Sequence, residues 1–181
     1  MEKQIALIRG INVGRAKRVA MADLRVLIED LGYSDVRTLL NSGNAVFTSP
    51  GVAAANTARR IAEALATRLG VSARVMTLTA EELATIVAGN PLGEVADDHS
   101  HLLVAVLGDP ADRAKLEPLV KQDWAPEAIA IGLRVAYLWC PGGVLESRLA
   151  EAVNRLLGDA VTTRNWATVL KLYTLTGGRE K

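Results

Sequence analysis

The chain has 181 residues, half of them hydrophobic, which is enough for one domain or two small ones with a real core. Aromatic residues make up only 4%, so aliphatic side chains must fill that core. The single cysteine, Cys140, excludes an intramolecular disulfide, and no apolar run reaches the ~18 residues of a membrane span. Because no signal-peptide pattern is present either, we expect a soluble cytoplasmic protein with no membrane partner.

The net charge of +1 conceals an uneven distribution. Residues 1–79 hold 11 Lys/Arg against 6 Asp/Glu, a net +5, whereas residues 80–160 hold 6 against 13, a net −7. Residues 161–181 hold 4 against 1, a net +3. Such a division can steer an anion to one face, or the oppositely charged parts can dock on each other. The sequence leaves both interpretations open.

Hydrophobic periodicity predicts the elements of the first half in chain order. A short apolar run at 5–9 indicates a buried strand, and the helical spacing that follows ends at Gly32. Two strand-like runs then flank Asn41-Ser42-Gly43-Asn44, which is typical of a hairpin. A helix ending at Gly70 and a further strand complete the half. The expected ranges are strand 5–9, helix 21–31, strands 36–40 and 45–48, helix 54–69 and strand 71–78.

The second half repeats the same order after a helix that begins with the capping box Thr79-Ala80-Glu81-Glu82. Asp109-Pro110 is typical of a helix start, with an N-cap followed by proline. The expected ranges are helix 80–88, strand 101–107, helix 110–120, strands 128–131 and 134–139, helix 145–156, strand 160–163 and a final helix that carries Trp166.

The order β-α-β-β-α-β, found twice, predicts an α+β fold. We expect two ferredoxin-like (split βαβ) halves with antiparallel sheets, each followed by an extra helix. The expected organisation is a first half at 1–79, a helix and connector at 80–100, and a second half with its C-terminal helix at 101–181.

Two polar segments of the first half are expected to meet in space. Strands one and two of a split βαβ unit run parallel, so the segments that follow them lie at the same end of the sheet. Gly10–Arg18 should therefore approach the 41–44 turn. Arg9 and Arg15 suit phosphate or carboxylate, and the helix that starts near Met21 adds exposed N–H groups.

The candidate ligand-binding residues of this end are Arg9, Asn12, Arg15, Ser42 and Asn44. The alternative is purely structural, since glycine and asparagine are what tight turns need and the basic residues can be solvated. Loops at a sheet end often carry function, and the sequence favours neither interpretation.

Arg164 and Asn165 complete the list of candidate ligand-binding residues. With Thr162 or Thr163 as N-cap, both residues would lie exposed in the first turn of the final helix, where a cation is unfavourable without an anion nearby. We expect Trp166 to fill a seam between the halves, so that Arg164 borders one cleft with Arg9, Asn12, Ser42 and Asn44. The alternative is that Arg164 pairs with the acidic middle segment.

The usual catalytic and cofactor motifs are missing from the sequence. It contains no P-loop, no dinucleotide fingerprint and no nucleophile elbow around Ser42. Asp97, Asp98, His99 and His101 have no second ligand cluster after them, so we expect a polar loop and no metal. Cys140 is expected to be a buried or strand-end thiol and not a nucleophile. No catalytic residue and no cofactor is assigned.

Several motifs together are similar to a known family. They are R-G-I-N-V-G at 9–14, T-L-L-N-S-G-N at 38–44, the Gly89-Asn90-Pro91-Leu92 segment, and T-T-R-N-W-A-T-V-L-K-L at 162–172. The chain resembles the bacterial family called domain of unknown function 1697 over nearly its whole length. It departs from that family at Arg15, Ala20, Asn41 and Ala167, where we associate the family with Gly, Pro, Gln and Asn. The resemblance implies a small α+β bacterial protein and no established activity.

Three functional hypotheses follow from the sequence. The first is a binding protein for a phosphorylated or otherwise anionic ligand, with nucleic acid among the candidates, at the sheet end formed by the 9–18 loop and the 41–44 turn. The alternative is an enzyme that acts on a small polar substrate in the cleft between the two halves. A structural or interaction protein is the third class, and the sequence assigns no oligomeric state.

Overall fold

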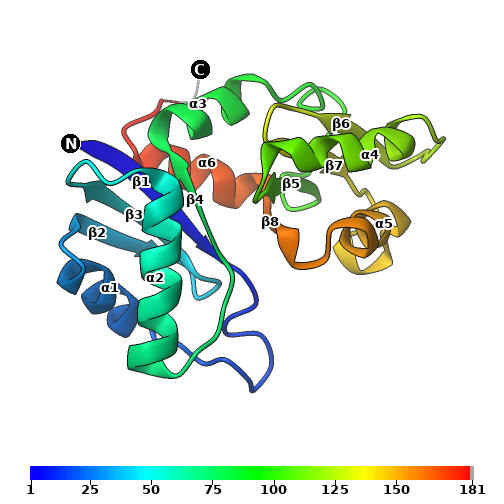
Figure 1. Ribbon diagram of the computed structural model, residues 1–181. Helices are drawn as coiled ribbons and strands as arrows, with labels where there is room; N and C mark the ends of the chain where they lie inside the picture. The colour runs from blue at the N-terminus through cyan, green and yellow to red at the C-terminus, as the bar shows by residue number, and fades with distance from the viewer. Residues whose placement is uncertain (180–181) are drawn as a thin grey trace. The chain divides into compact units, whose positions relative to one another are not determined.

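The computed structural model describes residues 1–179, which form two compact units (Figure 1). The first unit contains Met1–Ala84 together with the chain from Leu172 on, and the second contains Thr85–Lys171. Each unit has a four-stranded sheet, and every strand pair in both sheets is antiparallel. The predicted α+β fold of two ferredoxin-like halves is confirmed.

The sheet of the first unit has the strand order β2-β3-β1-β4. Both β1 and β2 pair antiparallel with β3, so they run parallel to each other, as predicted. The elements are β1 (Glu2–Ile8), α1 (Met21–Asp30), β2 (Ser34–Leu39), β3 (Asn44–Ser49), α2 (Ala54–Leu69), β4 (Val75–Thr79) and α3 (Ala80–Ala88).

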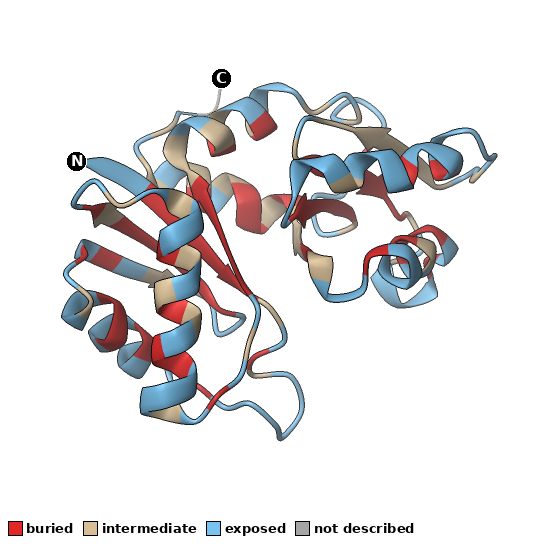
Figure 2. Cartoon of the chain, viewed as in Figure 1, coloured by how far each residue is buried: buried red, intermediate tan, exposed pale blue. Residues whose placement is uncertain are grey.

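The main core of the first unit lies between one face of this sheet and the helices α1 and α2. Side chains alternate along a strand, so Ala6 and Ile8 of β1 share this face with Ala45 and Phe47 of β3, and all four are buried. The ring of Tyr33 packs edge-on against Phe47, with centroids 5.0 Å apart. Figure 2 shows the buried inner stripe of each helix and its exposed outer side. The helices contribute Leu24, Leu27, Ile28, Ile61 and Leu65.

The sheet of the second unit has the equivalent order β6-β7-β5-β8. Its helical side is again apolar, with Leu116, Leu119, Leu149 and Val153 packed on the sheet. The elements are β5 (Leu102–Leu107), η1 (Pro110–Asp112), α4 (Arg113–Val120), β6 (Ala128–Ile131), β7 (Val135–Trp139), η2 (Val144–Glu146), α5 (Arg148–Leu157), η3 (Gly158–Ala160), β8 (Val161–Asn165) and α6 (Trp166–Leu175).

Both predicted helix starts are confirmed by their hydrogen bonds. The amide of Thr79 donates to Glu82 Oε2 at 2.8 Å, and the amide of Glu82 donates to Thr79 Oγ1 at 3.0 Å, which is a capping box. The carboxylate of Asp109 accepts from the amide of Ala111 at 2.9 Å, directly before the turn that opens with Pro110. Within the described residues, no helix is long and apolar enough to cross a membrane.

Tyr137 in the second sheet is buried, and its hydroxyl donates to the carbonyl oxygen of Ile86 at 2.7 Å. Burial raises the pKa of Tyr137 to about 12, above the ~10 of an exposed tyrosine. Because the folded protein holds the phenolic proton more tightly, this stabilisation is complete below about pH 10 and is lost as the pH rises from about 10 to 12.

We expect Tyr137→Phe to lower the free energy of unfolding by about 1–2 kcal/mol at neutral pH, since the Ile86 carbonyl loses its donor. Urea unfolding at several pH values tests both effects. The decline of stability above about pH 10 should be steeper in the wild type than in the variant. Equal slopes would contradict the assignment to Tyr137.

Candidate functional site

The loop that follows β1 is held in a compact conformation by residues with positive φ. Gly10 and Gly14 have φ of +72° and +63°, and Asn12 and Lys17 have φ of +56° and +51°. Glycine and asparagine tolerate this region better than other residues do. The amide of Asn12 donates to the carbonyl of Lys17 at 3.0 Å and so closes the loop on itself.

The side chain of Asn12 joins this loop to the turn after β2. Its Nδ2 donates to the carbonyl of Asn41 at 2.7 Å and to the carbonyl of Val19 at 2.8 Å. Its Oδ1 accepts from the amide of Val19 at 2.9 Å. The predicted meeting of the two segments is therefore confirmed. The side-chain amide of Asn12 bonds to the backbone of its own loop at Val19 and to the backbone of the turn at Asn41.

The turn itself is anchored to the end of β1. The amide of Ile8 donates to the carbonyl of Gly43 at 2.8 Å. Asn44 is fully buried, and its Nδ2 donates to the carbonyl of Leu39 and to Ser42 Oγ, each at 2.9 Å. These hydrogen bonds show that Asn44 and Ser42 stabilise the turn itself.

A pocket of about 340 Å³ opens where the loop reaches helix α1. Arg18 is exposed at its edge, and Ala20, the N-cap of α1, is extended and provides no side-chain cap for the first N–H groups of the helix. Such a helix start attracts anions, although Asp23 in the first turn opposes this effect. The pocket is lined by Asn12, Arg18, Val19, Ala20 and Asn41.

The predicted site residues of this end differ in their position relative to the pocket. Asn12 lines it, while Arg9, Arg15, Ser42 and Asn44 do not. Arg9 is partly exposed, and its amide donates to the carbonyl of Arg74 at 2.8 Å; Arg15 is exposed on the loop.

Arg18 and Asn41 are lining residues that the sequence-based list did not include. The signal that could have found Arg18 is its place two residues before the predicted start of α1. Asn41 could have been found from its place at the beginning of the hairpin turn.

The prediction that Arg164 and Asn165 lie in the first turn of the last helix is wrong. Both belong to β8, where Arg164 is opposite Val104 and Asn165 is opposite Leu103 of β5. This pairing extends the strand two residues beyond the predicted end, and Asn165 then caps α6 by accepting from the amide of Thr168 at 2.9 Å. The guanidinium of Arg164 donates to Thr162 Oγ1 at 3.2 Å and to the carbonyl of Thr163 at 2.9 Å.

Arg164 and Asn165 belong to the second unit, and the 9–18 loop belongs to the first. A cleft shared by Arg164 and the first-half loops therefore stays a prediction.

The acidic and histidine residues before β5 form a local turn. Asp98 accepts from the hydroxyl and the amide of Ser100, and these hydrogen bonds hold the pKa of its carboxyl below the ordinary value. His101 Nδ1 lies 3.7 Å from Asp98 Oδ2. Over residues 1–179, no group of three or more His, Cys, Asp or Glu side chains is arranged to hold a metal ion.

Cys140 is buried at the end of β7, as expected. Burial raises the pKa of its thiol, which disfavours the nucleophilic thiolate.

Comparison with known proteins assigns the family. Residues 1–137 match the model described as "Protein of unknown function (DUF1697)". The chain belongs to the DUF1697 family. No curated protein matches the sequence. A solved structure titled as that of the conserved bacterial protein SP0830 from Streptococcus pneumoniae is similar over 97% of this chain and 98% of the other, with a TM-score of 0.79 and 20% identity. At 20% identity, this similarity shows a shared fold and nothing about function.

Proposed function

We propose that this protein binds a phosphorylated or otherwise anionic ligand at the pocket beside the 9–18 loop. The observation that carries the proposal is the combination of this pocket with a cationic loop. Residues 3–22 contain five Lys or Arg and no Asp or Glu. Arg15, Lys17 and Arg18 are all exposed, so the loop presents a concentrated positive charge to solvent.

The backbone next to Arg18 is fixed by hydrogen bonds, which favours a ligand-binding role for this residue over a merely solvated loop. Its neighbour Val19 is buried and is bonded through both its amide and its carbonyl to the side chain of Asn12. The backbone that carries Arg18 is therefore fixed before a ligand arrives, which reduces the ordering entropy that binding must overcome. An arginine held at a helix N-terminus offers an anion a bidentate hydrogen-bond donor together with the exposed N–H groups of that helix.

Titration of the full chain at low salt tests the proposal. Inorganic phosphate and ATP are followed by calorimetry, and short labelled RNA and DNA oligonucleotides by fluorescence anisotropy. We expect Arg18→Gln to weaken binding about tenfold or more, because a charge-assisted hydrogen bond is lost. Asp23→Asn should strengthen binding, since it removes the opposing charge in the first turn of α1.

The matched control is Arg59→Gln in α2, an arginine of the same unit whose side chain is 70% exposed. It should bind like the wild type. If nucleic acid is the ligand, affinity should fall steeply between about 50 and 200 mM salt. Absence of binding to every probe at low salt, or equal losses in the Arg18 and Arg59 variants, would overturn the proposal.

A further inference from the structure

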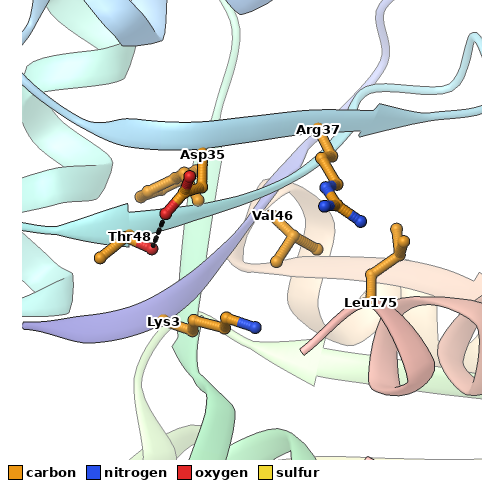
Figure 3. A pocket seen from close by; sticks show the side chains of 7 residues that line it. Lys3, Asp35, Arg37, Val46, Thr48 and Leu175 are labelled. Atoms are coloured by element: carbon orange, nitrogen blue, oxygen red, sulfur yellow. Dashed lines mark hydrogen bonds between the residues drawn. The ribbon is translucent and has the colours of Figure 1, made fainter. Parts of the chain in front are cut away.

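A second pocket, of about 230 Å³, lies on the face of the first sheet opposite α1 and α2 (Figure 3). The strand register places its residues side by side: Lys3 of β1 is opposite Thr48 of β3, and Arg37 of β2 is opposite Val46 of β3. The pocket shares no lining residue with the one beside the 9–18 loop. All of its lining residues belong to the first unit.

The pocket has an apolar floor. Val46 in the central part of the sheet is largely buried, and Leu175 from the end of α6 lies beside it. The end of α6 is held by a hydrogen bond from Lys3 Nζ to the carbonyl of Thr176, 3.3 Å long. The end of α6 therefore forms one wall of the pocket, and the same bond draws the Lys3 ammonium to that wall.

Two cations flank this floor. Figure 3 shows the Arg37 and Lys3 side chains extended from two different strands toward the space beside Leu175. Arg37 is exposed, and no hydrogen bond or ion pair joins its guanidinium to another of the residues 1–179. A guanidinium that no described residue engages, beside an apolar surface, can receive a carboxylate.

The third charged residue of the pocket is turned away from this space. The carboxylate of Asp35 accepts a hydrogen bond from Thr48 Oγ1 at 3.1 Å, on the side of the pocket away from Leu175. Two cations and one carboxylate leave the lining with a formal charge of +1. That charge suits a monoanion, because a second negative charge on the ligand would meet Asp35 without compensation.

We propose that this pocket binds a small monocarboxylate with a compact apolar body. Arg37 and Lys3 receive the carboxylate, and Val46 and Leu175 contact the hydrocarbon part. The volume lies below the ~300 Å³ at which drug-sized ligands begin, which restricts the body to a short branched chain or a single ring. This site is separate from the proposed function, and either can fail without the other.

Benzoate titrated into the full chain, with the methyl groups of Val46 and Leu175 observed by NMR, tests this proposal. We expect saturable shifts at both methyl groups. Benzamide, which has the same shape without the charge, and acetate, which has the charge without the ring, should each bind about tenfold more weakly or worse. Arg37→Gln should weaken benzoate binding by a similar factor, and Lys3→Gln should weaken it to a smaller or equal extent.

Arg59→Gln in α2, an exposed residue that does not line this pocket, is the control and should leave the benzoate affinity unchanged. Arg37 is exposed, so its variant should fold, and the unperturbed methyl spectrum of the variant verifies this. The proposal is overturned if benzoate gives no saturable shift at Val46 and Leu175, if benzamide binds equally well, or if Arg37→Gln and Arg59→Gln bind alike.

Discussion

Replacement of Gly43 by alanine should lower the free energy of unfolding by about 2–5 kcal/mol, through backbone strain and steric overlap together. Gly43 has φ of +85°, which side chains other than glycine rarely adopt. A Cβ at this position would lie 2.9 Å from Ile11 Cδ1 and 3.0 Å from Ile8 Cβ. Ile8 belongs to the buried strand β1, so the backbone beneath the new methyl group has no room to move.

Gly51→Ala separates these two contributions. Gly51 has an even larger positive φ of +97°, but nothing lies within 4 Å of the Cβ that alanine would add. The Gly51→Ala variant should therefore lose only the contribution of backbone strain, a decrease of about 1–2 kcal/mol in the free energy of unfolding. Chemical denaturation of both variants gives the comparison. A Gly43 variant no less stable than the Gly51 variant would show that β1 yields to the added methyl group.

Asn12→Ala should lower the free energy of unfolding by about 2–4 kcal/mol. The substitution removes three hydrogen bonds and leaves the amide and carbonyl of Val19 without that partner. Alanine is also less suited than asparagine to φ of +56°. The loss should be accompanied by faster hydrogen exchange at the Val19 amide, because its acceptor is gone.

Asn41→Ala is the matched control for this prediction. Asn41 contributes only its backbone carbonyl to the bond with Asn12, and its own side chain is exposed. The free energy of unfolding of this control should therefore lie within about 0.5 kcal/mol of the wild-type value. Asn12→Gly adds a second comparison, since glycine accepts the positive φ and removes only the hydrogen bonds. Equal stability of Asn12→Ala and the wild type would remove the structural role assigned here.

The fold could be predicted from local patterns because those patterns agree with the final packing. Alternation along β1 places Ala6 and Ile8 on one face, and helical spacing places the apolar stripe of α1 against that same face. The capping box at Thr79 and the proline after Asp109 mark helix starts by local hydrogen bonds that need no tertiary context. The meeting of the two loops followed from topology alone, because β1 and β2 run parallel.

What could not be predicted depended on distant partners. The last residues of β8 remain extended because Arg164 and Asn165 pair with β5, more than fifty residues earlier in the chain, and that pairing outweighs the local preference for a helix. The polar turn residues were also hard to classify. Asn12 and Asn44 have the residue type of a binding site, yet their amides bond to backbone groups, which only the folded chain reveals.

The first unit is assembled from both ends of the chain, since it contains Met1–Ala84 and the segment from Leu172 on. On a ribosome that adds about 5–20 residues per second, the 87 residues from 85 to 171 delay that closing segment by about 4 to 17 seconds. During this interval the growing chain has all four strands of its first sheet but lacks Leu175, which lines the same pocket as Val46. A chain whose synthesis stops before Leu175 would leave Val46 without this apolar neighbour, and exposed apolar surface on an incomplete chain is what chaperones bind and where aggregation begins.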